Sequence, residues 1–275
     1  MAFRNILLAY SGEAAFLSSL RHALKIVRQH DGWLTGVFRN GPSYIDRYGA
    51  GLSGELRAKL ETVESEDMQA AIALFHEEAA LAGLSDRVAF LDPGEVGALP
   101  PSEIARSYDL VVTGAQSHLP NEEHRAASPD MLALRSGRPV LIVPDGYNAP
   151  GLADHALVAW DGKRSAARAL NDAMAIFETD RRRVTVLTVG AAPGSPPPGG
   201  GIVTHLQRHD VEALHLHKRP KHQSIAQLIE ATAEEIGAKL IVMGAYEHSK
   251  FSQDMFGGVT HEVLRNARVP VLMSH

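Results

Sequence analysis

The sequence predicts an α/β protein built from two consecutive, doubly wound, open parallel sheets. Short apolar runs alternate with segments whose apolar residues recur every three or four positions, the pattern of strands and helices in a parallel sheet. This alternation occurs twice along the 275 residues. Hydrophobic residues make up 45% of the chain and charged residues 21%, which is typical of a folded globular protein rather than a disordered one.

The two halves of the chain resemble each other in sequence. Residues 3–26, FRNILLAYSGEAAFLSSLRHALKI, correspond to residues 153–176, ADHALVAWDGKRSAARALNDAMAI. A second pair is YDLVVTGAQSH at 108–118 and AKLIVMGAYEH at 238–248, and the runs RPVLIVP and VPVLMSH form a third. Such self-similarity indicates a tandem duplication.

Strands and helices follow in order from these patterns. In the first half, apolar runs predict strands near 5–10, 33–38, 87–91, 109–113 and 139–143. An amphipathic helix follows the first strand, and a long helical stretch at about Glu55–Leu81 is an insertion relative to the second half. The turn-rich segment PDGYNAPG at 144–151 reads as a linker, so we predict domains at 1–148 and 149–275.

The second half repeats the order of the first. Its predicted strands lie near 156–160, 184–189, 212–216, 239–243 and 270–273, and its helices near 163–178, 202–209, 223–236 and 257–266. Right-handed crossovers then give an open sheet whose ligand crevice lies at the carboxyl ends of the strands. Asp161 and Gly244 both lie at such ends.

Composition excludes several classes of function. A net charge of −5 and a pI near 6.3 leave no basic surface for nucleic acid. The absence of cysteine excludes disulfides, thiol catalysis and Cys-ligated metal sites. No apolar stretch approaches the roughly 18 residues of a membrane span. The start, MAFRNILLAYSG, lacks the features of a signal peptide, so we expect a cytoplasmic protein without membrane partners.

Residues at the carboxyl ends of the second-half strands can bind an anion or a hydroxyl group. Gly257 and Gly258 open a predicted helix, whose first amides and partial positive charge favour a phosphate. Glycine also lets a phosphate approach the backbone closely. Asp161 can accept hydrogen bonds from an amino or hydroxyl group. The structural alternative is that Asp161-Gly162 is only a turn and that the helix-start glycines serve packing.

These segments resemble the universal stress protein family in its tandem two-domain form. The resemblance rests on ALVAWDG, LIVMGAYEHS, FGGVT and the terminal VPVLMSH, and it covers nearly the whole chain. It implies an adenine nucleotide alpha hydrolase-like fold, with two copies packed as a pseudo-dimer, and a stress-response regulator that binds ATP, ADP or AMP. The nucleotide-binding positions that it implies are Ala159, Asp161, Val189, Met243, Gly244, Glu247, Gly257, Gly258, Val259 and Thr260.

The nucleotide motif of the family is only partly present. Members look like G-x-x-G, nine residues, then G-[S/T]; here Gly244 and Gly257 fit, but Glu247 and Gly258 replace the other two. A carboxylate about 4 Å from a phosphate costs about 1 kcal/mol in water and about 4 kcal/mol at an effective dielectric near 20. We therefore expect weak binding, unless Glu247 turns outward or pairs with a lysine. AMP and ADP are then tolerated as well as ATP, and Mg²⁺ is able to bridge Glu247 to the phosphates.

The first copy lacks most of these features, so we predict a degenerate, structural domain without an anion site. Ser11 occupies the position of Asp161. The positions of the glycine motif are occupied by Gly114, Ser117, Ala127 and Ser128. The apolar terminal strands PVLIV and PVLM are predicted to form the seam between the copies, because bare strand edges invite aggregation.

Two interpretations of function stay open at this point. The first is the nucleotide-binding regulator, with a second copy of the chain or another protein as a further partner. The second is a scaffold that does not bind nucleotide and acts through protein contacts, a metal or a small apolar ligand. The sequence has no G-x-S-x-G or G-x-x-x-x-G-K-[S/T] motif, so we predict no catalytic residue and only slow, incidental ATP hydrolysis. The histidine pairs His205/His209 and His215/His217 match no ligand signature, and no metal site is predicted.

Overall fold

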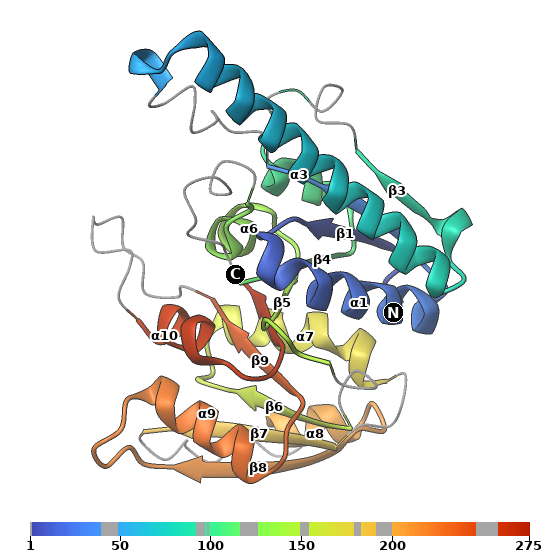
Figure 1. Ribbon diagram of the computed structural model, residues 1–275. Coiled ribbons are helices and arrows are strands. Elements are labelled where there is room, and N and C mark those ends of the chain that lie inside the picture. The colour runs from blue at the N-terminus through green and yellow to red at the C-terminus, as the bar shows by residue number, and fades with distance from the viewer. Residues whose placement is uncertain are drawn as a thin grey trace. The chain divides into compact units, whose positions relative to one another are not determined.

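The computed structural model describes residues 2–39, 49–91, 97, 99–115, 126–148, 154–178, 183–190, 200–245 and 258–275. The chain divides into two compact units, Phe3–Arg138 and Pro139–His275, the second of which also takes in Met1–Ala2 (Figure 1). No helix among the described residues is both long and apolar enough to cross a membrane.

The first unit contains a parallel sheet in the order β3-β2-β1-β4. Its strands are β1 (Asn5–Ala9), β2 (Trp33–Val37), β3 (Val88–Phe90) and β4 (Leu110–Gly114). Its helices are α1 (Glu13–His30), α3 (Gly54–Leu81), α5 (Pro101–Ile104) and α6 (Pro129–Arg135), with short 3-10 turns η1 (Gly49–Gly51), η2 (Ser85–Arg87) and η3 (Ala105–Ser107). Every residue of β4, and all but the first of β1, is buried, as expected for strands covered by helices on both faces.

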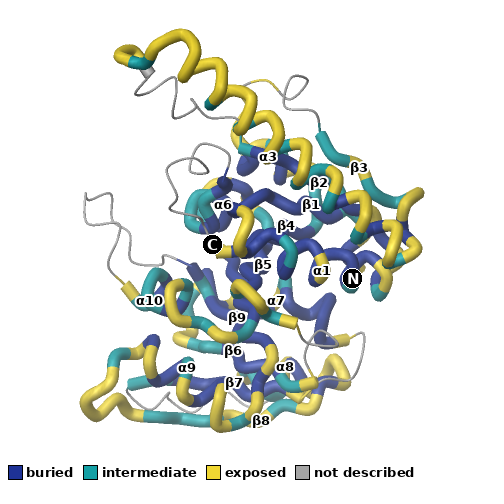
Figure 2. The backbone as a smooth tube through the Cα atoms, viewed as in Figure 1, coloured by how far each residue is buried: buried dark blue, intermediate teal, exposed yellow. Residues whose placement is uncertain are grey.

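The two long helices of this unit differ in how they are held. Helix α1 buries most of one face and ends at Asp31, which adopts the left-handed conformation (φ 52°) that stops a helix. Helix α3 begins at a Ser53 cap, whose hydroxyl accepts a hydrogen bond from the Leu56 amide. Of its residues only Phe75 and Ala79 are buried, and Figure 2 shows the amino-terminal part of α3 almost wholly exposed.

The second unit contains a sheet in the order β5-β10-β9-β6-β7-β8. The strands are β5 (Val140–Val143), β6 (His155–Ala159), β7 (Arg183–Val189), β8 (Glu212–Lys218), β9 (Leu240–Gly244) and β10 (Val271–Ser274). All neighbours are parallel except β5 and β10, which run antiparallel with Leu141 opposite Leu272. The helices are α7 (Arg164–Phe177), α8 (Ile202–Gln207), α9 (Ile225–Glu235) and α10 (Val259–Asn266).

The predicted α/β fold with parallel sheets is confirmed, and each predicted strand boundary lies within two residues of the observed one. The pairing of the apolar terminal strands is also present, as the β5–β10 ladder. Strand β5 groups with the second unit, although the sequence pattern counts it with the first copy. The pairing of β5 with β10 explains this grouping, because it covers an edge of each of these two apolar strands.

Candidate functional site

The carboxyl ends of β6 and β9 meet where the strand order of the second unit reverses. From β6 the sheet continues through β7 to β8 on one side and through β9 to β10 on the other. Ala159, the last residue of β6, lies opposite Met243 of β9. In open α/β sheets, ligands bind in the crevice outside the carboxyl ends of strands at such a reversal. The predicted residues Asp161, Val189 and Gly244 belong to the same edge.

Asp161 holds the turn between β6 and α7. Its Oδ1 accepts a hydrogen bond from the backbone amide of Lys163 at 2.9 Å, and Gly162 between them adopts a left-handed conformation with φ 76°. This is the structural role that an Asp-Gly pair commonly has. The side chain is nevertheless 50% exposed, and its Oδ2 lies 3.8 Å from Lys163 Nζ. One oxygen of this half-exposed carboxylate therefore fixes the turn, while the other lies near a cation.

Gly244 is explained by packing. A Cβ at this position would lie 2.5 Å from the backbone nitrogen of Ala166 and 2.6 Å from the carbonyl carbon of Ser165, both in the first turn of α7. Gly114 is the equivalent residue of the first unit, and a Cβ there would lie 2.4 Å from Ala15 Cβ in the first turn of α1. The glycine that both copies share lets a strand end approach the first turn of a helix, and this role needs no ligand.

The start of α10 is less tightly packed than the surroundings of Gly244. Gly258 precedes the helix with an extended backbone (φ 172°), and a Cβ there would meet no atom within 4 Å among the described residues. Its carbonyl accepts the first helical hydrogen bond, from the Glu262 amide at 3.1 Å. Among the described residues, no side chain forms a capping hydrogen bond with this helix. Open space beside an uncapped helix start leaves room for an anion near the positive end of the helix dipole. Val259 and Thr260 form this first turn, and Thr260 is buried.

The end of β7 is fixed by hydrogen bonds to β8. Gly190 donates its amide to the Lys218 carbonyl at 3.0 Å, and its own carbonyl lies 2.9 Å from His217 Nε2. Val189, which precedes it, is half-buried and pairs with Lys218. Because Trp160 donates its amide to the Leu187 carbonyl at 2.8 Å, the segment after β6 stays attached to β7. The backbone near Val189 therefore lies close to the turn that carries Asp161.

Two residues at the C-terminus, Ser274 and His275, anchor the carboxyl ends of β9 and β10. Ser274 donates its hydroxyl to Asp172 Oδ2 at 2.8 Å, and Arg168 Nε donates to the same oxygen at 3.0 Å. His275 Nδ1 lies 2.8 Å from the Ala245 carbonyl, and the Ala245 amide donates to the Ser274 carbonyl. Sequence reasoning missed this network. The only signal was the Arg168-Asp172 spacing of four on a helix, which is as often a simple surface pair.

Glu247 and Gly257, two of the predicted site residues, lie outside the described residues. The same holds for Lys250, a lysine with which Glu247 is able to pair, and for Ser117 of the first copy. The predicted repulsion between Glu247 and a phosphate is therefore an expectation about sequence and charge alone. The described residues bring Ala159, Asp161, Val189, Met243 and Gly244 to one edge of the sheet, with Gly258, Val259 and Thr260 at the start of the helix that connects β9 to β10.

The corresponding edge of the first unit is filled with aromatic rings. Tyr10, which follows β1, has its ring centroid 5.1 Å from that of Phe16 on α1 and 4.9 Å from that of Phe38 after β2. All three side chains are buried. Ser11, at the position of Asp161, is completely buried and accepts a hydrogen bond from the Gly114 amide at 3.0 Å. Side chains therefore fill the end of β1 in the first copy; that this copy lacks an anion site stays a prediction.

The histidines of the second unit take part in ordinary polar contacts. The rings of His205 and His209 lie 4.9 Å apart, and His209 Nδ1 is 2.9 Å from Glu178 Oε1. His215 Nε2 lies 2.9 Å from the Thr188 hydroxyl. In the part of the chain that the structure describes, no group of three or more His, Asp or Glu side chains could hold a metal ion.

Comparison with known proteins identifies the second half. Residues 153–275 match the model of the universal stress protein family. The second half of the chain is a universal stress protein domain. No curated protein sequence matches the chain.

The solved structures extend the likeness of fold to the whole chain. A universal stress protein from Archaeoglobus fulgidus DSM 4304 is 17% identical, with 99% of this chain and 97% of that chain covered at a TM-score of 0.73. A universal stress family protein from Burkholderia pseudomallei is 28% identical over 44% of this chain and 94% of its own (TM-score 0.32). A universal stress protein in complex with cAMP is 20% identical, with 46% of this chain and 98% of that chain covered (TM-score 0.32). The first of these matches shows that the whole chain has the fold of that protein.

Proposed function

We propose that the universal stress protein domain of the second half binds an adenine nucleotide at the carboxyl edge of β6 and β9, and that the protein acts as a stress-response regulator through this binding. One observation carries the proposal most strongly. At the reversal of strand order, the half-exposed carboxylate of Asp161 occurs on the same edge as a helix start that, within the described residues, has no side-chain cap and has open space beside Gly258.

Each group has a distinct role in this proposal. The phosphates lie at the start of α10, where Gly258 and Val259 present backbone amides and the positive end of the helix dipole. Asp161 Oδ2 accepts a hydrogen bond from a ribose hydroxyl or an amino group of the base. The backbone near Val189 contacts the base. Lys163, whose ammonium lies beside Asp161, adds positive charge at the same edge.

Affinity is expected to be low and weakly dependent on the number of phosphates. Gly258 lacks the hydroxyl that the family motif has at this position, which removes one side-chain donor. A carboxylate at Glu247 repels the outer phosphates, and Mg²⁺ offsets this repulsion for ATP. AMP, ADP and ATP therefore bind within about tenfold of one another in the absence of Mg²⁺, a spread of about 1.4 kcal/mol.

Isothermal titration calorimetry on nucleotide-free protein tests the proposal. Asp161→Asn is expected to weaken AMP binding about tenfold, because it removes an acceptor for a ligand hydrogen bond and a charge. Asp154→Asn is the matched control, since Asp154 is exposed at the opposite, amino end of the same strand. AMP binding that is absent in the unmodified protein, or equally weakened by both substitutions, would refute the proposal.

A scaffold function is the second candidate, and the exposed surface of α3 favours it. Leu56 and Val63 on this helix are 45% and 51% exposed, and they lie seven residues apart on one helix face. A scaffold acts through such a face without any nucleotide. Protein purified with no added nucleotide separates the two candidates, because a denatured sample releases AMP, ADP or ATP only if the nucleotide site is occupied.

A further inference from the structure

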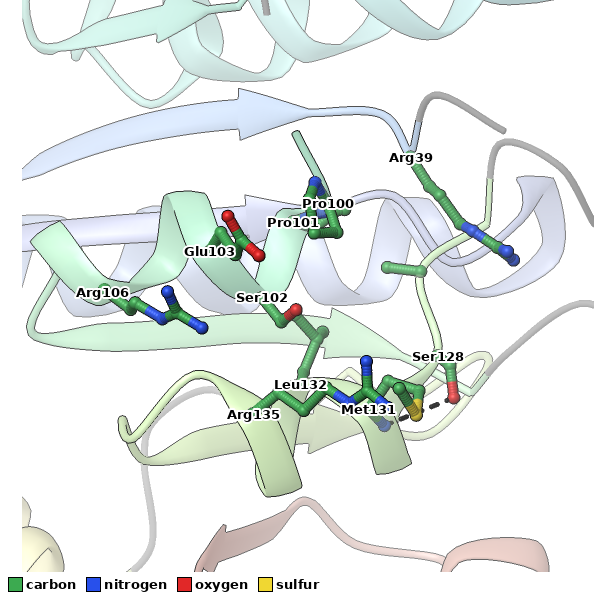
Figure 3. Close-up of a pocket in the computed structure, with 11 residues that line it drawn as sticks. Arg39, Pro100, Pro101, Ser102, Glu103, Arg106, Ser128, Met131, Leu132 and Arg135 are labelled. Carbon is green, nitrogen blue, oxygen red and sulfur yellow. Dashed lines mark hydrogen bonds between the residues drawn. The ribbon is translucent and has the colours of Figure 1, made fainter. Parts of the chain in front are cut away.

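The first unit contains a cavity that the proposed nucleotide site does not involve. It has a volume of about 420 Å³, within the range of small-molecule sites, and it lies between α5 with η3 on one side and α6 on the other (Figure 3). Its lining residues are Arg39, Pro100, Pro101, Ser102, Glu103, Arg106, Ala127, Ser128, Met131, Leu132 and Arg135.

Positive charge dominates the polar part of this lining. Three arginines accompany a single carboxylate, Glu103. Figure 3 shows Arg106, from η3, and Arg135, from the last turn of α6, around Ser102. Within the described residues neither guanidinium has a carboxylate at ion-pair distance. Guanidinium groups bind phosphate and carboxylate oxygens through paired N–H donors, so two of them beside one cavity suit a dianion.

Ser102 adds a polar group to the wall of the cavity. The residue is 6% exposed and lines the cavity. Among the described residues, its hydroxyl is not one of the enclosed side-chain atoms that lack a hydrogen-bond partner, so it is open to the cavity. A hydroxyl can both donate to and accept from a ligand oxygen placed there. Ser128, in contrast, already accepts a hydrogen bond from the Met131 amide as the cap of α6.

Apolar groups form the rest of the wall. Pro100, Pro101, Met131 and Leu132 contribute carbon surface, and Leu132 is fully buried beneath it. A hydrated inorganic ion gains nothing from such a surface, whereas an organic group attached to the anion loses water when it packs there. The lining therefore combines a cationic part with an apolar part.

We propose that this cavity binds a small phosphate monoester that carries an apolar group. The phosphate contacts Arg106, Arg135 and the Ser102 hydroxyl, and the organic group packs on the proline and methionine wall. The proposed phosphate contacts come from α5, η3 and α6, whereas Tyr10, Phe16 and Phe38 fill the carboxyl end of β1. The cavity borders that end, because its lining residue Ala127 donates its amide to the Tyr10 carbonyl. The first copy then keeps a binding function although the crevice at its strand ends is closed.

Phenyl phosphate is the probe for this site, and calorimetry with the full chain gives the readout. Arg106→Gln and Arg135→Gln are each expected to weaken binding at least about tenfold, since each removes a charge-assisted contact. Ser102→Ala weakens it about threefold. Glu103→Gln strengthens it, because it removes a negative charge from the lining. Arg57→Gln, which changes an exposed arginine on α3 paired with Glu61, leaves the affinity unchanged.

Several outcomes would overturn the proposal. One is the absence of saturable phenyl phosphate binding at millimolar concentration. Another is a loss of phenyl phosphate affinity in Arg106→Gln and Arg135→Gln that is no larger than the loss in Arg57→Gln. Benzoate, which carries one charge, and inorganic phosphate, which lacks the apolar group, are each expected to bind at least about tenfold more weakly than phenyl phosphate. Equal affinity for either of them contradicts the assignment. Asp161→Asn leaves phenyl phosphate binding unchanged, so failure here is distinct from failure of the nucleotide site.

Discussion

In the first half of the chain, the rings of Tyr10, Phe16 and Phe38 pack together at the end of β1, and Ser11 is buried beneath them. In the second half, residue 166 at the position of Phe16 is an alanine, and the position of Ser11 is Asp161 with half of its side chain exposed. Both copies keep one backbone contact at this point, since Tyr10 and Trp160 each donate their amide to a carbonyl of the second strand of their copy. The two copies thus differ in side-chain volume and polarity at a few positions of this edge, while the shared glycine keeps its packing role.

The glycine comparison gives the largest expected effect. Gly244→Ala puts a methyl group within 2.6 Å of backbone atoms of Ser165 and Ala166, so the helix start has to move. We expect the free energy of unfolding to fall by about 3 kcal/mol, the upper part of the usual cost of overpacking. Gly258→Ala is the matched control, because its backbone is extended and the space beside it is open. Urea unfolding measures both, and equal losses would contradict the distinction between a packing glycine and an open one.

Acid is expected to destabilise the first unit through His22. Burial lowers the pKa of this imidazole from 6.5 to about 4, with the charge of Lys25 as a smaller cause. The folded state therefore binds the proton less tightly than the unfolded state. Above the unfolded-state pKa of His22 the ring is neutral in both states and stability is complete. As the pH falls below that pKa, only the unfolded state gains the proton, and the free energy of unfolding decreases. Between about pH 7.5 and pH 5 the loss is about 2 kcal/mol.

His22→Met removes this dependence, because methionine fills a similar volume and does not titrate. Unfolding free energies measured across the same pH window should then change less with pH than in the unmodified protein. His205→Met, at an exposed histidine of the second unit, should leave the slope as it was. A slope that is the same in all three proteins would contradict a buried neutral His22.

Ser11 and Asp161, which occupy equivalent positions after the first strand of each half, should also differ in their contribution to stability. Ser11→Ala removes the acceptor of the buried Gly114 amide and should cost about 1.5 kcal/mol, within the range for an orphaned buried donor. Asp161→Ala disturbs only an exposed turn and should cost about 0.5 kcal/mol or less. Thermal and urea unfolding compare the two variants. A larger loss in Asp161→Ala would mean that this side chain, like Ser11, is mainly structural.

Glu230 in the second unit should respond to pH in the opposite direction to His22. Burial raises the pKa of this carboxyl, the nearby Glu262 raises it further, and Arg268 acts against them; its Oε1 is buried without a hydrogen-bond partner among the described residues. The folded state therefore holds the proton more tightly than the unfolded state, and stability falls as pH rises above the ordinary glutamate range. Glu230→Gln should raise the free energy of unfolding at neutral pH by about 1 kcal/mol.

The exposed Glu234 on the same helix supplies the control for this prediction. Glu234→Gln should change neither the free energy of unfolding nor its pH dependence by more than a few tenths of a kcal/mol, which is usual for a surface position. If Glu230→Gln were no more stabilising than Glu234→Gln, the carboxyl of Glu230 would have to be ionised at little cost in the folded protein.

The strand positions were predictable because each buried parallel strand is a short apolar run bounded by turn residues, as in LVVTG of β4. The pairing of β5 with β10 was predictable, because both are apolar terminal strands whose edges need cover. The grouping of β5 with the second unit was not, since the repeat assigns that strand to the first copy. The edge that carries Asp161 was predictable from the repeat and the strand order. The aromatic filling at Tyr10 was not, since it needs rings from three separate segments. The cavity beside Ser102 also escaped notice, because α5 has only four residues and leaves no periodic pattern.

NMR chemical-shift mapping with AMP tests the central difference between the two halves most directly. On titration of AMP into isotope-labelled, nucleotide-free protein, the account predicts saturable shifts of the Ala159, Val189, Gly244, Gly258 and Val259 amides. The amides of Tyr10, Ser11 and Gly114 should not move. Shifts at the end of β1 that equal those at the end of β6, or shifts at neither end with AMP at millimolar concentration, would contradict the account.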